Sequence, residues 1–205
     1  MLGLTTLRRW WPGVLLAMCL CSASPAAYAN EAQLQLQAVF LGRFASYVQW
    51  LEGSQREVFE MAVVGPNPFG QQLQALYADK LIHGRPVRIT QADSLAALGP
   101  QPPDLLFIAL PTVAERQAAI AYAHRAHILT VSDAKGFAEQ GGIIQMTRVA
   151  QNVQIKINYD AALTSGLRIA APLLSIATVL REDSPWSYFC ASCRWLYWAC
   201  LGPRP

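Results

Sequence analysis

Charge is scarce in this sequence, and neither sign dominates. Only 14% of the 205 residues are charged, and the formal net charge is +3. Two of the positive charges, Arg8 and Arg9, belong to an N-terminal segment that we expect to be removed. A hydrophobic content of 53% excludes a disordered chain. The small net charge gives no electrostatic reason to expect nucleic-acid binding.

The longest apolar run near the N-terminus is too short for a membrane span. It covers residues 14–20, whereas a spanning helix needs about 20 residues. It follows the Arg8-Arg9 pair and precedes Ala27-Tyr28-Ala29, a cleavage site of the A-x-A type. Residues 1–29 therefore predict a secretory signal peptide and a periplasmic mature protein. The alternative is an uncleaved N-terminal anchor.

Cysteine is absent from residues 30–189. Two of the five cysteines lie in the leader, and the others are Cys190, Cys193 and Cys200. The expected domain, residues 30–182, must therefore be stabilised by burial rather than by disulfides. The aromatic, Cys-rich tail, residues 183–205, has three interpretations: an extension without function, a membrane-contacting segment, or a redox or metal-binding pair.

Residues 30–182 alternate between helical and strand patterns. The expected helices are 31–50, a helix starting at Phe69, 115–125, 161–166 and 171–180, and the expected strands are 58–65, 87–90, 105–110, 127–131, 143–149 and 153–159. This order predicts a single α/β domain. Its mixed, mainly parallel sheet is flanked by helices on both faces and ends in a C-terminal antiparallel hairpin.

Catalytic and cofactor motifs are lacking. H-E-x-x-H, G-x-S-x-G, S-x-x-K and G-x-G-x-x-G are all absent, and the chain has three histidines. Gly65 and Gly70 are interpreted as turn residues rather than as a phosphate loop. We expect no enzyme, no catalytic residue, no metal and no cofactor, and the competing hypothesis is a hydrolase that uses Ser132.

Two features remain without a chemical role. The Gly141-Gly142 pair predicts unusual backbone dihedrals or a close approach. The segment after the hairpin has more apolar residues than a turn needs, among them Leu167, Ile169 and Leu174. They either pack the last helices on the sheet or line an exposed groove that receives a partner.

Short motifs in a fixed order resemble those of a known family, the YfiR family of periplasmic regulators. The resemblance runs from about residue 32 to residue 180. It is carried by the segments 38–50 (AVFLGRFASYVQW), 63–65 (VVG), 68–70 (PFG), 84–87 (GRPV), 104–108 (DLLFI), 128–133 (ILTVSD), 136–138 (GFA), 141–144 (GGII), 155–158 (IKIN), 166–169 (GLRI) and 173–174 (LL).

The resemblance implies a function by binding. Members of this family are small α/β periplasmic domains, often homodimers, and the namesake is not an enzyme. It represses an inner-membrane diguanylate cyclase by binding the periplasmic sensor domain, and an outer-membrane lipoprotein can sequester it. Release of the cyclase raises cyclic di-GMP and favours biofilm.

The resemblance also implies a partner-binding region in the C-terminal part of the domain. In this sequence it comprises Asn158, Leu163, Leu167, Arg168, Ile169 and Leu174. Members of the namesake type carry cysteines inside the domain, whereas this domain has none. The competing hypothesis is a periplasmic small-ligand sensor or solute-binding domain, with its ligand at the carboxyl ends of the strands near Gly65, Leu110 and Ser132.

Overall fold

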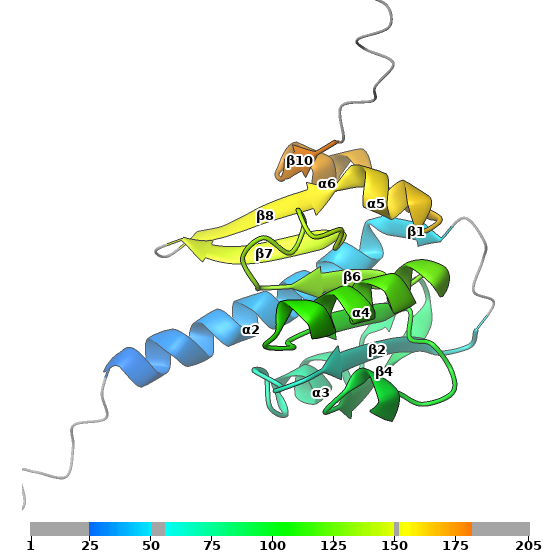
Figure 1. The fold of residues 1–205 in the computed structure, drawn as a ribbon. Helices are drawn as coiled ribbons and strands as arrows, with labels where there is room; N and C mark the ends of the chain where they lie inside the picture. The colour runs from blue at the N-terminus through cyan, green and yellow to red at the C-terminus, as the bar shows by residue number, and fades with distance from the viewer. Residues whose placement is uncertain (1–24, 51–55, 150–151, 182–205) are drawn as a thin grey trace, which may run out of the picture.

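The computed structural model describes the backbone of residues 25–50, 56–149 and 152–181, and side chains within these ranges from residue 34 onward (Figure 1). The expected tail, residues 183–205, and most of the expected signal peptide lie outside the described residues. The first described helix, α2 (Pro25–Ser46), begins before the expected cleavage site. The signal peptide and its cleavage stay predictions.

An eight-stranded mixed sheet forms the centre of the fold. Its strand order is β10-β8-β7-β6-β5-β2-β4-β3. The strands are β2 (Phe59–Val64), β3 (Leu81–Ile82), β4 (Arg85–Ala92), β5 (Leu105–Ile108), β6 (Leu129–Ser132), β7 (Ile144–Val149), β8 (Asn152–Asn158) and β10 (Thr178–Leu180). Only the β3–β4 and β7–β8 pairs of this sheet are antiparallel. The predicted fold class and the predicted hairpin are confirmed.

Helices cover both faces of this sheet. Helices α2 and α3 (Gln72–Tyr77) pack on one face, and α4 (Val113–Arg125) packs on the other (Figure 1). Successive residues of β2 and β5 belong alternately to the two cores, because side chains of a strand point alternately to opposite faces. The strands in the middle of the sheet are therefore buried on both sides, which accounts for the continuous apolar runs of β2 and β5.

Local polar residues fix where the helices begin. Thr112 and Glu115 form a capping box at α4: the Glu115 amide donates to Thr112 Oγ1 (3.2 Å), and the Thr112 amide donates to Glu115 Oε2 (3.3 Å). Asn67 Oδ1 accepts a hydrogen bond from the Phe69 amide (2.9 Å). This turn delays the next helix, so α3 begins at Gln72 rather than at the predicted Phe69.

The predicted first helix is too long at its C-terminal end. Helix α2 ends at Ser46, and residues Val48–Trp50 form the strand β1. β1 pairs antiparallel with β9 (Leu167–Ile169) in a separate two-stranded sheet. The β-branched and aromatic residues of β1 fit a strand as well as a helix, and this distant partner decides between them.

The predicted closing helices are also wrong in part. The chain forms α5 (Tyr159–Thr164), then β9, then the short helix α6 (Ala171–Ser175), and finally β10. The helix expected over 171–180 stops early because Thr178–Leu180 pairs in parallel with β8. Within the described residues, no helix has the length and apolar character that crossing a bilayer requires.

Candidate functional site

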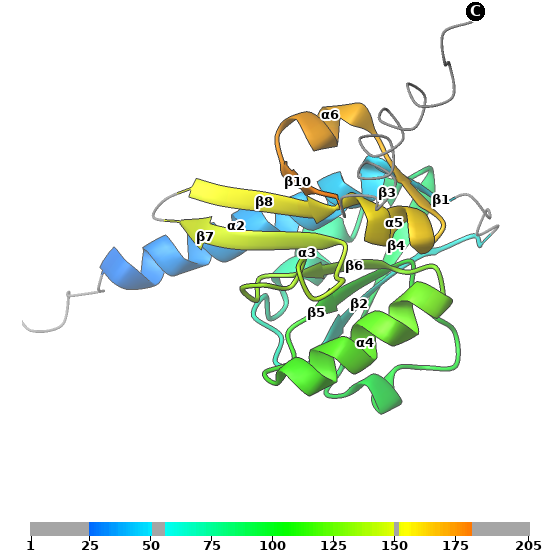
Figure 2. The ribbon, with the colours of Figure 1, turned by 45° about the horizontal axis from the view of Figure 1, so that its top comes forward.

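The predicted partner-binding residues lie on consecutive elements at one end of the sheet. Asn158 ends β8, Leu163 lies on α5, residues 167–169 form β9, and Leu174 lies on α6. Figure 2 shows α5, α6 and β10 together beside the C-terminal end of β8. The structure thus brings the six residues into one region, but it gives them different exposures.

Asn158 has a role in the fold. Its Oδ1 accepts a hydrogen bond from the Ala161 amide (2.9 Å) and caps α5. Its Nδ2 donates to the Ala138 carbonyl (2.9 Å). Because both ends of the side-chain amide are bound by the backbone, Asn158 positions α5 against the loop before β7.

The three side chains of β9 point alternately into the core and outward. Leu167 and Ile169 point into the core, with exposed fractions of 0% and 4%. Arg168 points outward and is exposed, opposite Gln49 of β1. Within the part of the chain that the structure describes, Arg168 makes no ion pair. Arg168 is therefore the residue of this strand that a partner can reach.

The two remaining predicted residues, Leu163 and Leu174, also differ in how exposed their side chains are. Leu163 on α5 is 42% exposed. Leu174 on α6 is half-buried and packs against the core that contains Leu167 and Ile169. The accessible part of the predicted set is Leu163 and Arg168, with Leu174 reached in part.

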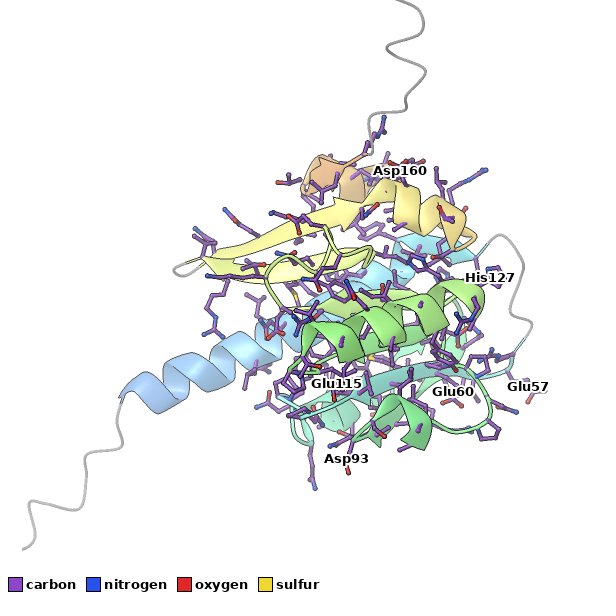
Figure 3. All side chains as sticks on the ribbon, in the orientation of Figure 1. Glu57, Glu60, Asp93, Glu115, His127 and Asp160 are labelled. Carbon is purple, nitrogen blue, oxygen red and sulfur yellow. The ribbon has the colours of Figure 1, made fainter. Side chains whose placement is uncertain are left out.

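Trp50 connects the small sheet to the main sheet, and sequence reasoning missed it. Its Nε1 donates to the His127 carbonyl (3.1 Å), and its ring meets Phe59 and His83 edge-on at 5.9 Å each. His127 lies at the C-terminal end of α4 (Figure 3), and its Nδ1 lies 3.0 Å from the Ser165 carbonyl.

His127 and His83 both have positive φ, at 56° and 51°. This conformation favours glycine, and histidine is among the few other residue types enriched in it, but no local pattern in the sequence identifies these two histidines.

An apolar groove lies next to this region, between α2 and α6. Its volume is about 400 Å³, and its lining residues are Leu36, Val39, Phe40, Arg43, Phe44, Tyr47, Pro172, Leu173 and Ile176. Phe44 and Leu173 are buried at its floor, whereas Leu36 (44%) and Ile176 (65%) are exposed. Of the two interpretations of the apolar C-terminal residues, packing holds for Leu167 and Ile169. An exposed groove also exists, but α2 supplies one of its sides.

The histidines and Ser132 are bound by backbone groups. His83 Nε2 lies 2.8 Å from the Ala45 carbonyl, and His124 Nε2 lies 2.9 Å from the Gly141 carbonyl. Ser132 Oγ donates to the Ile108 carbonyl (2.6 Å) and accepts from the Ala134 amide (3.2 Å). Among the described residues, no group of three or more His, Cys, Asp and Glu could hold a metal ion.

At the carboxyl ends of the central strands, proposed above as a ligand site, the chain makes close contacts with itself. Gly65 has a φ of 93°, and a Cβ there would lie 3.0 Å from the Ala109 carbonyl carbon. The Arg116 guanidinium, buried at the start of α4, donates to the carbonyls of Leu110 (2.9 Å) and Pro111 (2.8 Å). The first contact brings together the turns after β2 and β5, and the Arg116 hydrogen bonds tie the loop after β5 to α4.

An ion pair lies beside the cap of α5. Lys156 Nζ donates to Glu139 Oε1 at 2.7 Å, and both side chains are partly exposed. This hydrogen bond from Lys156 lowers the pKa of the Glu139 carboxyl from its usual value. Because the pair is close to solvent, it contributes at most about 1 kcal/mol to stability.

Comparison with known proteins identifies the fold and the family. No curated protein matches the chain. A solved structure, described as a conserved domain protein from Vibrio cholerae O1 biovar El Tor, is 15% identical with a TM-score of 0.50, and this likeness shows the fold alone. The alignment covers 73% of this chain and 60% of that one. A family model described as YfiR/HmsC-like matches residues 34–178. The chain therefore belongs to the YfiR/HmsC-like family, as the resemblance predicted.

Proposed function

We propose that this protein is a periplasmic regulatory binding protein that represses an inner-membrane diguanylate cyclase. It binds the periplasmic sensor domain of the cyclase and thereby lowers cyclic di-GMP and limits biofilm. Family membership over residues 34–178 is the observation that carries this proposal. In this proposal the protein acts by binding, and it needs neither a catalytic residue nor a cofactor.

The outer side of β9 is the surface that we assign to the partner. Buried Leu167 and Ile169 anchor the strand, and this anchoring holds exposed Arg168 in a fixed place. Leu163 offers an apolar contact on the neighbouring helix. A guanidinium with no ion pair among the described residues favours a carboxylate on the partner.

Two further partners belong to the same proposal. A second copy of the chain would form a homodimer, and an outer-membrane lipoprotein would compete with the cyclase for the protein. Both rest on family membership alone. Light scattering during gel filtration measures the first, and capture from outer membranes measures the second.

A crosslinking pull-down from periplasm and membranes tests the cyclase proposal. The wild-type protein is compared with Arg168→Glu and with a matched control, Arg148→Glu, which makes the same charge change at an exposed position on β7. We expect the wild type and the control to capture a diguanylate cyclase, and Arg168→Glu to capture about tenfold less.

The outcomes separate the parts of the proposal. Capture of no cyclase by the wild type contradicts repression of a cyclase, and capture of another membrane sensor changes the pathway. Equal capture by all three proteins keeps the cyclase but rules out the outer side of β9 as its binding surface. Circular dichroism melts of the three proteins confirm that the variants are folded.

A further inference from the structure

The groove between α2 and α6 is an apolar surface that the described residues leave uncovered. Phe40 and Phe44 stack along one side, with ring centroids 5.7 Å apart, and Leu173 completes the floor. Ile176 stands at the rim with 65% of its surface exposed. A contiguous patch of this kind marks an interaction site more often than a free surface.

We propose that the chain's own C-terminal segment, residues 183–205, docks in this groove through its first aromatic residues. These are Trp186, Tyr188 and Phe189. The groove of about 400 Å³ is large enough to receive bulky side chains. The segment then covers the groove and competes with any other protein that uses it.

The distance along the chain fits this arrangement. Ile176 lines the groove, and the last described residue, Arg181, follows five residues later. Five residues span at most about 18 Å. Trp186 lies five residues beyond Arg181, so the chain can return over the same distance and reach the groove with its first aromatic residue.

The starting point of the segment is fixed by the fold. Leu180 pairs with Asn158 at the end of β10, and the Arg181 guanidinium lies over the Tyr159 ring, 5.1 Å from its centroid. Figure 2 shows β10 and α6 at the same end of the sheet. The C-terminal segment therefore starts beside the groove and not across the molecule from it.

Charge favours this occupant over a second copy. Arg43 lines the groove, is exposed and makes no ion pair within the described residues. The residues that enter the segment, Glu182 and Asp183, are both acidic. A symmetric contact between two grooves would instead bring two Arg43 charges into one interface without an acidic partner.

The distribution of cysteine allows a direct test in the whole mature chain, residues 30–205. The described residues contain no cysteine, and Cys190 directly follows Phe189. The test variant carries Ile176→Cys, with Cys193→Ser and Cys200→Ser, so that Cys190 is its one other thiol. The matched control carries Leu163→Cys in the same background. Leu163 is 42% exposed on α5, four residues from Tyr159, whose ring Arg181 covers, so the segment can reach it without entering the groove, which Leu163 does not line.

Glutathione disulfide serves as the oxidant, at low protein concentration. The two protein thiols lose two protons and two electrons and form a disulfide, and glutathione disulfide is reduced to two thiols. A disulfide needs Cα atoms about 4.4–6.8 Å apart, so its rate reports docking. We expect the intramolecular disulfide to form at least about tenfold faster with Ile176→Cys than with Leu163→Cys, as peptide mapping under non-reducing conditions measures.

Two results would overturn the proposal. Equal intramolecular rates in the two variants would mean that the segment does not favour the groove. Intermolecular disulfides as the main product of Ile176→Cys would assign the groove to a second copy. Adding Trp186→Ser and Phe189→Ser should lower the Ile176→Cys rate to that of the control, and an unchanged rate would also contradict docking through these side chains. The readout contains no cyclase, so it is independent of the proposed function.

Discussion

The hydroxyl of Tyr77 bridges the amide of Gly42 and the carbonyl of Ala38 in helix α2. Gly42 N donates to Tyr77 Oη at 2.8 Å, and Tyr77 Oη donates to the Ala38 carbonyl at 2.8 Å. These two backbone groups are four residues apart, the spacing of a helical hydrogen bond. Tyr77 ends α3, so one buried hydroxyl holds α3 against the helix that lines the groove.

Removing this hydroxyl should destabilise the protein. We expect Tyr77→Phe to lower the free energy of unfolding by about 1–3 kcal/mol, because the two buried hydrogen bonds between the hydroxyl and α2 are lost. Urea denaturation measures the change. Tyr122→Phe is the matched control, since the Tyr122 hydroxyl makes no hydrogen bond within the described residues. Equal stabilities of the two variants would mean that α2 closes its own hydrogen bond when the hydroxyl is gone.

Gly42→Ala should destabilise the protein, although alanine is the better helix former. In an exposed helix the change stabilises by about 1 kcal/mol. Here the new Cβ would lie 2.3 Å from Tyr77 Oη and 2.7 Å from its ring, so the tyrosine must move. We expect a loss of about 1–3 kcal/mol in the same denaturation experiment. Gly99→Ala is the control, because a Cβ there meets nothing within 4 Å; a stabilising Gly42→Ala would contradict the close contact.

Stability should fall at high pH because of Tyr77. Burial raises the pKa of the Tyr77 hydroxyl above its usual 10.0, and the hydrogen bond from Gly42 lowers it by less. The folded protein therefore keeps this proton where the unfolded chain loses it. The stabilisation is complete below pH 10 and is lost as the pH rises through the raised folded pKa. The difference in unfolding free energy between wild type and Tyr77→Phe should shrink from about pH 9 to pH 11, and a constant difference would contradict the shift.

Substitutions of two neighbouring residues on β9 should change stability by very different amounts. Leu167→Asp places an unpaired carboxylate in the core and should lower the free energy of unfolding by about 3 kcal/mol or more. Arg168→Glu changes an exposed side chain and should alter it by less than about 0.5 kcal/mol. Thermal melts followed by circular dichroism compare the two. Similar losses would mean that Arg168 also supports the fold.

Much of the fold could be predicted because its signals are local. The buried runs of β2 and β5 can be read directly from short stretches of sequence, whereas the helix predicted over 115–125 begins earlier, at Val113, after the Thr112 cap. The Gly141-Gly142 prediction is confirmed: Gly141 has a φ of 98°, and a Cβ on Gly142 would lie 2.1 Å from the Phe137 ring. Such positions can be recognised because glycine is the residue type that best tolerates a positive φ or a close approach of another group to its Cα.

The site was predicted less well because its geometry depends on distant contacts. Residues 48–50 continue the helical pattern of α2, yet they pair with 167–169. The alternation Leu167-Arg168-Ile169 already indicates a strand with one outward residue, but three residues are too few to identify it. Trp50 bonds to the carbonyl of His127, and Ile176 lines a groove together with residues of α2. Both neighbours lie far away along the chain, so no local sequence pattern predicts these contacts.

The pairing of β1 with β9 also governs the order in which the molecule can form. Val48 pairs with Ile169, so the small sheet closes a loop that contains every other strand of the fold except β10. The entropy lost on closing a loop grows with its length, and contacts between distant residues slow folding. A chain that crosses a membrane N-terminus first must therefore keep β1 unpaired until residue 169 has emerged. The surface around Arg168 is then among the last parts of the domain to form, so the partner contact proposed there requires the finished domain.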